Sequence, residues 1–192
     1  SAYHAPFDAR SANRFRSVPA RSAGFRLSLR PVHRQDEQQV PTTNKAGDTY
    51  TISELSLEML WVEPGTFTMG SPTSETGRFS NESQHEVTLT EGFWLGKYEV
   101  TRGQWNQMIG TIPSFKGVNR PVESVSWTEV TAFCDKLTEL ERKAGHLPAR
   151  MAYQLPTEAQ WEYACRAGTT TRFAFGDELT EQDANFDKNV GE

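Results

Sequence analysis

Apolar positions are unevenly distributed along this 192-residue chain. An alternating run over residues 25–29 predicts a short strand, because successive side chains of a strand point to opposite faces. Residues 32–51 are polar and contain Pro, Gly and Asn, a composition typical of a linker. From residue 55 to about residue 175 the apolar density is high, which predicts the start of a globular domain.

The domain is predicted to open with a β-hairpin. The segment EMLWVEPGTFTMGS alternates on both sides of the turn dipeptide Pro64-Gly65. In this interpretation Leu60 and Val62 share one face of the first strand. After a polar loop, the segments HEVTLT and FWLGKYEVT are rich in β-branched and aromatic residues, so both are predicted to be strands.

Three helices are predicted to follow, each beginning with a capping box. In this motif the hydroxyl of a Ser or Thr accepts a hydrogen bond from the backbone amide three residues later. The side chain of a Glu or Gln at that later position accepts one from the backbone amide of the Ser or Thr. The predicted start residues are Thr101, Ser126 and Thr157. The predicted stop residues are Gly110, Gly145 and Gly168.

Apolar residues spaced three and four apart predict one buried stripe on each helix. On the third helix this stripe comprises Trp161, Ala164 and Cys165, and Cys134 lies on the stripe of the second. The five tryptophans are predicted to lie in the core. Strands and helices do not alternate as βαβ units, so the pattern predicts an α+β domain with short antiparallel strands, three helices and much irregular structure.

Composition and charge exclude several classes of protein. Hydrophobic residues make up 36% and aromatic residues 11% of the chain, which is not a disordered composition. A net charge of −5 argues against a nucleic-acid partner. No apolar run reaches the ~20 residues of a membrane helix, so no membrane segment is predicted. The chain begins at Ser1 without a Met, so the sequence leaves the compartment open.

Five segments together resemble the formylglycine-generating enzyme family, also called the sulfatase-modifying factor family. They are WVEPGTFTMGS, KYEVTRGQW, RPVESVSWTEVTAFCDKL, LPTEAQWEYACRAG and ANF, and they cover about residues 55–190 in order. The resemblance implies a C-type-lectin-like fold with short antiparallel strands, present here in incomplete form.

The opening segment RSANRFRSVPARSAGFRL resembles the other end of the same family domain. The expected organisation is therefore a tail of a preceding domain over residues 1–31, a linker over 32–51, and the N-terminal part of a second domain over 52–192. A fragment of a tandem-domain protein is the simpler interpretation, and a circular permutation is the alternative.

Family members with oxidase activity convert a sulfatase cysteine to formylglycine with a cysteine pair in the tail. Those two positions fall near Tyr3 and Asp8. A phenol and a carboxylate do not supply the soft thiolate ligands that Cu(I) prefers. The resemblance thus implies no copper centre and no catalytic residue in this tail, and it leaves open whether the chain is an enzyme.

Some family members carry disulfides to tail cysteines whose positions here are about Asn13 and Leu27. The resemblance therefore implies that Cys134 and Cys165 are core thiols outside any disulfide, as in a bacterial-type member.

The family also binds calcium. The resemblance places one ligand at the Asn185 side chain and another at the Phe186 carbonyl, because oxygen donors suit this cation. It implies calcium in the complete domain. The alternative is that Asn185 only caps a turn.

Two functions remain open. The first is a family domain for oxidation of a cysteine in a protein or peptide substrate such as a sulfatase, expected to be inactive in this chain. The second is a non-catalytic lectin-like binding module, including proteins that display a variable tail. The display positions would then be Tyr3, His4, Phe7, Asp8, Phe15 and Val18.

The resemblance also predicts how the opening strand is used, because first and last strands of the family domain lie side by side. The second domain has its first strand at 57–62 and would leave that edge unpaired, which is costly. Residues 24–29 are therefore predicted to pair with residues 57–62, with Leu27 facing the core near Cys134.

Overall fold

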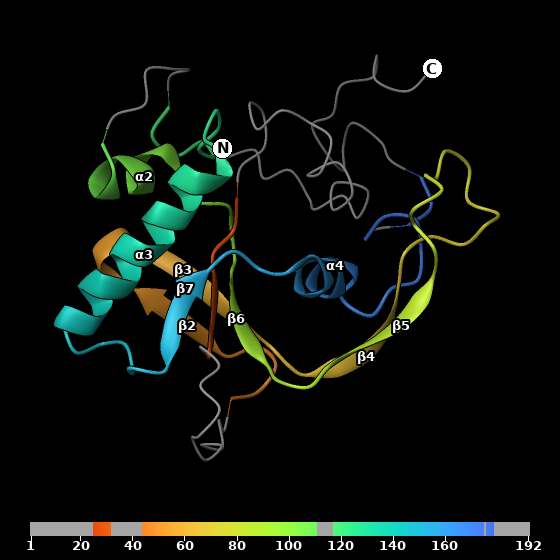
Figure 1. Cartoon of the computed structure of the whole chain (residues 1–192), viewed down its shortest axis with the longest axis horizontal. Helices are drawn as coiled ribbons and strands as arrows, with labels where there is room; N and C mark the ends of the chain where they lie inside the picture. Colours follow the sequence, from red (N-terminus) through yellow and green to blue (C-terminus); the bar gives the residue numbers. More distant parts are fainter. Residues whose placement is uncertain (1–24, 32–43, 111–116, 175, 179–192) are drawn as a thin grey trace. The chain divides into compact units, whose positions relative to one another are not determined.

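The computed structural model describes residues 25–31, 44–110, 117–174 and 176–178 (Figure 1). The chain divides into two compact units. The sheet unit takes its described residues from 19–65 and 89–156. The ribbon unit takes its described residues from 66–88 and 157–192.

The sheet unit is built on a five-stranded antiparallel sheet with the order β2-β3-β6-β1-β7. Its strands are β1 (Ser28–Pro31), β2 (Thr49–Ile52), β3 (Leu57–Val62), β6 (Phe93–Gly96) and β7 (Met151–Gln154). A 3-10 helix, η1 (Ser53–Leu55), connects β2 to β3. The helix α3 (Trp127–Lys143) packs against β7, and α2 (Arg102–Met108) packs against α3 (Figure 1). The predicted α+β class is confirmed.

The opening strand β1 lies inside this sheet, between β6 and β7. Ser28 is opposite Leu95 on one side and Gln154 on the other. The prediction that it pairs with residues 57–62 is wrong. Both edges of β3 are already occupied, by β6 and by β2, where Thr49 is opposite Leu60. Residues 49–51, assigned above to the linker, belong to β2.

The core of the sheet unit joins β1 to the helices. Leu27 is fully buried in one hydrophobic cluster with Cys134, as predicted. The Phe25 ring lies edge-on to the rings of Trp105 and Phe133, with centroids 5.9 Å and 5.7 Å away. The rings of Trp105 and Phe133 are stacked at 5.4 Å. Aromatic pairs of this kind add to the stability gained by burial alone.

Three α-helices occur among the described residues: α2 (Arg102–Met108), α3 (Trp127–Lys143) and α4 (Glu158–Arg166). All three predicted capping boxes are formed. The prediction that every Trp lies in the core is wrong for Trp127, which is 70% exposed. It is the first residue of α3, and the buried residues of this helix begin at Val130.

The ribbon unit contains a two-stranded sheet of β4 (Gly65–Met69) and β5 (His85–Leu89), beside α4 (Figure 1). The Phe67 and Tyr163 rings, from β4 and α4, lie 5.3 Å apart. The predicted hairpin of β3 with β4 is wrong, since β3 is paired on both edges and β4 pairs with β5 instead. Leu60 and Val62 lie on the same face of β3, as predicted. They are partly exposed and alternate with the buried residues of the opposite face. No described helix is long and apolar enough to cross a membrane.

Candidate functional site

The residues predicted from the family resemblance lie outside the described part of the chain. They are the copper-ligand positions Tyr3 and Asp8, the calcium positions Asn185 and Phe186, and the display positions His4, Phe7, Phe15 and Val18. Calcium binding therefore stays a prediction. The described residues contain three arrangements relevant to chemistry: two thiols, an ion-pair network and a carboxylate–histidine cluster.

The two thiols are buried. Cys134 and Cys165 are 2% and 6% exposed, and neither forms a disulfide, which confirms that prediction. Burial, together with the charge of Asp135, raises the pKa of Cys134 to about 12. Only the thiolate is a nucleophile or a metal ligand, so this thiol is unreactive at neutral pH. These are the only cysteines in the sequence, and two buried thiols do not fit a copper–thiolate centre.

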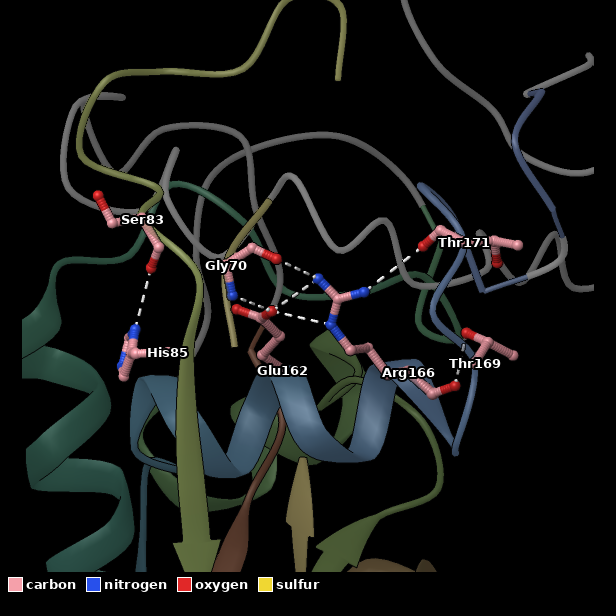
Figure 2. A network of polar contacts seen from close by, with 7 residues as sticks. All are labelled: Gly70, Ser83, His85, Glu162, Arg166, Thr169 and Thr171. Carbon is pink, nitrogen blue, oxygen red and sulfur yellow. Dashed lines mark hydrogen bonds and ion pairs between the residues drawn. The ribbon is translucent and has the colours of Figure 1, made fainter. Parts of the chain in front are cut away.

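The ribbon unit is held together by an ion pair on α4 (Figure 2). The Arg166 Nη2 and Nε atoms lie 2.8 Å and 2.9 Å from Glu162 Oε1. The same carboxylate oxygen accepts from the Gly70 amide at 2.9 Å, and Arg166 Nη2 donates to the Gly70 carbonyl at 2.9 Å. Both charged side chains are largely buried, so the network fixes the end of β4 on α4.

This network supports the fold rather than chemistry, because its charges already satisfy one another. Thr169 donates to the Arg166 carbonyl at 2.8 Å and so fastens the segment that follows α4 (Figure 2). His85, also drawn in Figure 2, contacts the Ser83 carbonyl at 3.0 Å and is no part of the ion pair.

The prediction that Trp161, Ala164 and Cys165 form the buried stripe of α4 is wrong in part. The helix buries Gln160, Glu162 and Cys165, whereas Trp161 and Ala164 are half-buried. The spacing of Glu162 and Arg166, four residues apart, is the sequence signal for the ion pair.

Replacing Gly70 with Ala is expected to destabilise the ribbon unit. Gly70 has a φ of +94°, and a Cβ there would lie 2.7 Å from the Ser83 carbonyl oxygen. Gly168→Ala is the matched control, since Gly168 has a φ of +85° and no atom within 4 Å of its Cβ position. The free energy of unfolding of the control should fall by about 1–2 kcal/mol, because alanine is strained in the left-handed conformation. That of Gly70→Ala should fall by roughly 1–3 kcal/mol more, because of the clash. Urea unfolding of both variants measures this difference, and equal losses would contradict it.

The sheet unit contains a second polar cluster, made by Tyr50, Glu54, Glu141, His146 and Tyr153. Glu141 is 1% exposed, and its Oε2 accepts from the Tyr50 hydroxyl at 3.1 Å. The Tyr50 and Tyr153 hydroxyls are 3.3 Å apart. The His146 Nδ1 lies 3.6 Å from Glu141 Oε1 and 3.8 Å from Glu54 Oε1.

Burial is the main reason why the pKa of Glu141 is raised, and the neighbouring Glu54 adds to it. The pKa of Glu54 is lowered, mainly because Glu54 is hydrogen-bonded to Glu141. Burial also raises the pKa of Tyr50 and of Tyr153, so both phenols stay protonated donors. The two carboxyls can therefore share one proton, with Glu141 as its carrier.

This cluster was not predicted from the sequence. The sequence signal for a buried carboxyl was a charged residue at a position where the helical spacing calls for an apolar one. Glu141 continues the spacing of Val130, Cys134 and Leu137. The structure buries all four residues.

The sulfatase-modifying factor enzyme 1-like domain model matches residues 45–191. The chaperone protein LppX of Paenibacillus barcinonensis is 33% identical over 149 residues, which are 64% of this chain and 49% of that protein. The formylglycine-generating enzyme of Streptomyces coelicolor is 40% identical over 90 residues, 46% of this chain and 23% of the enzyme.

Among solved structures, PvdO from Pseudomonas aeruginosa matches with a TM-score of 0.55 and 28% identity, over 66% of this chain and 54% of PvdO. The chain thus spans about half, or less, of the length of these relatives. Because the family model covers more than half of the chain, these similarities show that the chain belongs to the sulfatase-modifying factor enzyme 1-like (formylglycine-generating enzyme) domain family.

Proposed function

We propose that this chain acts by binding a polypeptide and not by oxidising one. The observation that carries the proposal is that both cysteines of this sequence, Cys134 and Cys165, are buried, and neither stands at the tail positions of the family's cysteine pair. Formylglycine formation in this family depends on a cysteine pair that takes part in redox chemistry. A buried thiol with its pKa raised to about 12, as at Cys134, does not supply a thiolate at neutral pH.

Two of the similarities support a protein ligand. The relative from Paenibacillus barcinonensis bears the name of a chaperone protein. Others are formylglycine-generating enzymes, whose family substrate is a cysteine-bearing protein such as a sulfatase. A binding module that keeps the family fold and lacks the reactive thiols would retain recognition of a polypeptide without the oxidation step.

The activity prediction is tested with a sulfatase-motif peptide. The whole chain is incubated with Cu(I), oxygen and the peptide, and the peptide mass is followed. The expected result is no conversion above a sample without protein, while the Streptomyces coelicolor enzyme converts the peptide under the same conditions. Conversion of the cysteine by this chain would contradict the proposal.

The binding side of the proposal needs a separate measurement. The same peptide and a reduced, unfolded polypeptide are labelled, and their fluorescence anisotropy is followed as the chain is added. The expected result is saturable binding of at least one of them. If neither binds at protein concentrations where the Streptomyces coelicolor enzyme binds the peptide, the chain does not recognise polypeptides of these kinds.

A further inference from the structure

We propose that Glu54, Glu141 and His146 form a binding site for a divalent transition-metal ion of the zinc class. The site lies in the sheet unit and is independent of the polypeptide-binding function proposed above. Its ligands come from three places: η1, the last turn of α3, and the segment that follows α3.

The distances suit a single ion. One potential ligand atom from each of the three residues lies within 4.8 Å of the other two. The His146 Nδ1 is 3.6 Å and 3.8 Å from the nearest Glu141 and Glu54 oxygens. In a tetrahedral centre with bonds of about 2.0–2.1 Å, ligand atoms are about 3.3 Å apart. The three side chains therefore need to move only by fractions of an ångström to about one ångström.

An unpaired buried oxygen supplies the independent evidence. Glu141 is 1% exposed, and in its ionised form its buried Oε1 accepts from no hydrogen-bond donor, because the bond with Glu54 forms only when one of the two carboxyls is protonated. A buried acceptor left without a partner is costly, and a carboxylate oxygen more so. This oxygen faces His146 Nδ1 and Glu54, so a cation between the three groups would satisfy it.

The surroundings hold the ligands in place. The Tyr50 hydroxyl donates to the other oxygen of Glu141, and the Tyr153 hydroxyl is 3.3 Å from that of Tyr50. The amides of His146 and Leu147 both donate to the Glu141 carbonyl, at 2.9 Å and 3.2 Å, which keeps His146 beside the end of α3. Such contacts around the ligands are a regular part of metal centres.

The donor set decides the class of ion. Two carboxylate oxygens and one imidazole nitrogen are ligands that Zn²⁺ accepts, and the two negative charges balance the ion. Ca²⁺ and Mg²⁺ prefer six or more oxygen ligands, which this cluster does not offer. Glu54 and His146 are partly exposed, so the ion can enter from solvent and a water can complete the coordination.

The test is calorimetric titration of the metal-free full chain with ZnCl₂ near neutral pH. A single ion per chain should bind. Glu54→Gln and His146→Gln should each weaken binding by about tenfold or more, because each removes a direct ligand. Both side chains are partly exposed, and circular dichroism checks that the variants are folded.

Two matched controls should bind zinc like the unchanged chain. Glu139→Gln removes an exposed carboxylate two residues before Glu141 on the same helix, and His85→Gln removes an exposed imidazole in the ribbon unit. Tyr50→Phe leaves all three ligands and should weaken binding by about tenfold by loosening Glu141. The proposal is overturned if zinc does not bind, if Glu54→Gln and His146→Gln bind it unchanged, or if equimolar Ca²⁺ displaces it.

Discussion

A chain that begins at residue 32 is expected to lose the cooperative unfolding transition of the sheet unit. The shortened chain lacks β1, which in the full chain lies between β6 and β7 and pairs with both. It also loses the bonds from the Gly96 and Val100 amides to the carbonyls of Leu27 and Phe25, each 2.8 Å long. The sheet would be split, with two new unpaired edges.

The buried side chains set the size of this effect. Phe25, Leu27 and Leu29 are each at most 5% exposed. Truncating a buried Leu or Phe to Ala costs about 2–5 kcal/mol. A domain is stable by only about 5–15 kcal/mol in total. Losing the three side chains together should therefore remove most or all of the stability.

Near-ultraviolet circular dichroism and urea unfolding of the two chains measure this effect. Adding a synthetic peptide with the sequence GFRLSLRP should restore part of the signal to the shortened chain, and a scrambled peptide of the same composition should not. In the full chain, Leu27→Ala should lower stability by about 2–5 kcal/mol. Unfolding of the shortened chain at the same urea concentration as the full chain would show that β1 is dispensable.

The Arg166→Ala substitution is expected to lower the stability of the ribbon unit by about 3–5 kcal/mol. It leaves the carboxylate of Glu162, whose side chain is only 8% exposed, without its counter-charge. It also removes the donor to the Gly70 carbonyl. Arg166→Lys should lose less, because it keeps the charge but not the forked geometry that reaches both groups.

The matched control is Lys143→Ala on α3. Lys143 pairs with Glu139 at the same four-residue spacing, but the two side chains are 75% and 65% exposed. Exposed pairs of this kind contribute less than about 1 kcal/mol. Urea unfolding of both variants should therefore give a much larger loss for Arg166→Ala. Equal losses would mean that burial adds nothing to the α4 ion pair.

The helices were predictable from the sequence because their signals are local. In each capping box the two reciprocal hydrogen bonds join residues three positions apart, as between Thr101 and Gln104. The pattern of residue types therefore determines where each helix begins, whatever packs against it. The buried state of Cys134 was predictable in the same way, from its position on a helical stripe.

Strand partners and the polar cluster were decided only by the tertiary structure. The strands β3 and β4 were recognised, but pairing depends on which edges other strands occupy, and β2 and β6 hold both edges of β3. The environment of Glu141 depends on Tyr50, which β2 brings to it from 91 positions earlier in the sequence. Side-chain alternation determines which residues can share a face, whereas competition between distant segments for edges and for buried space determines which of them meet.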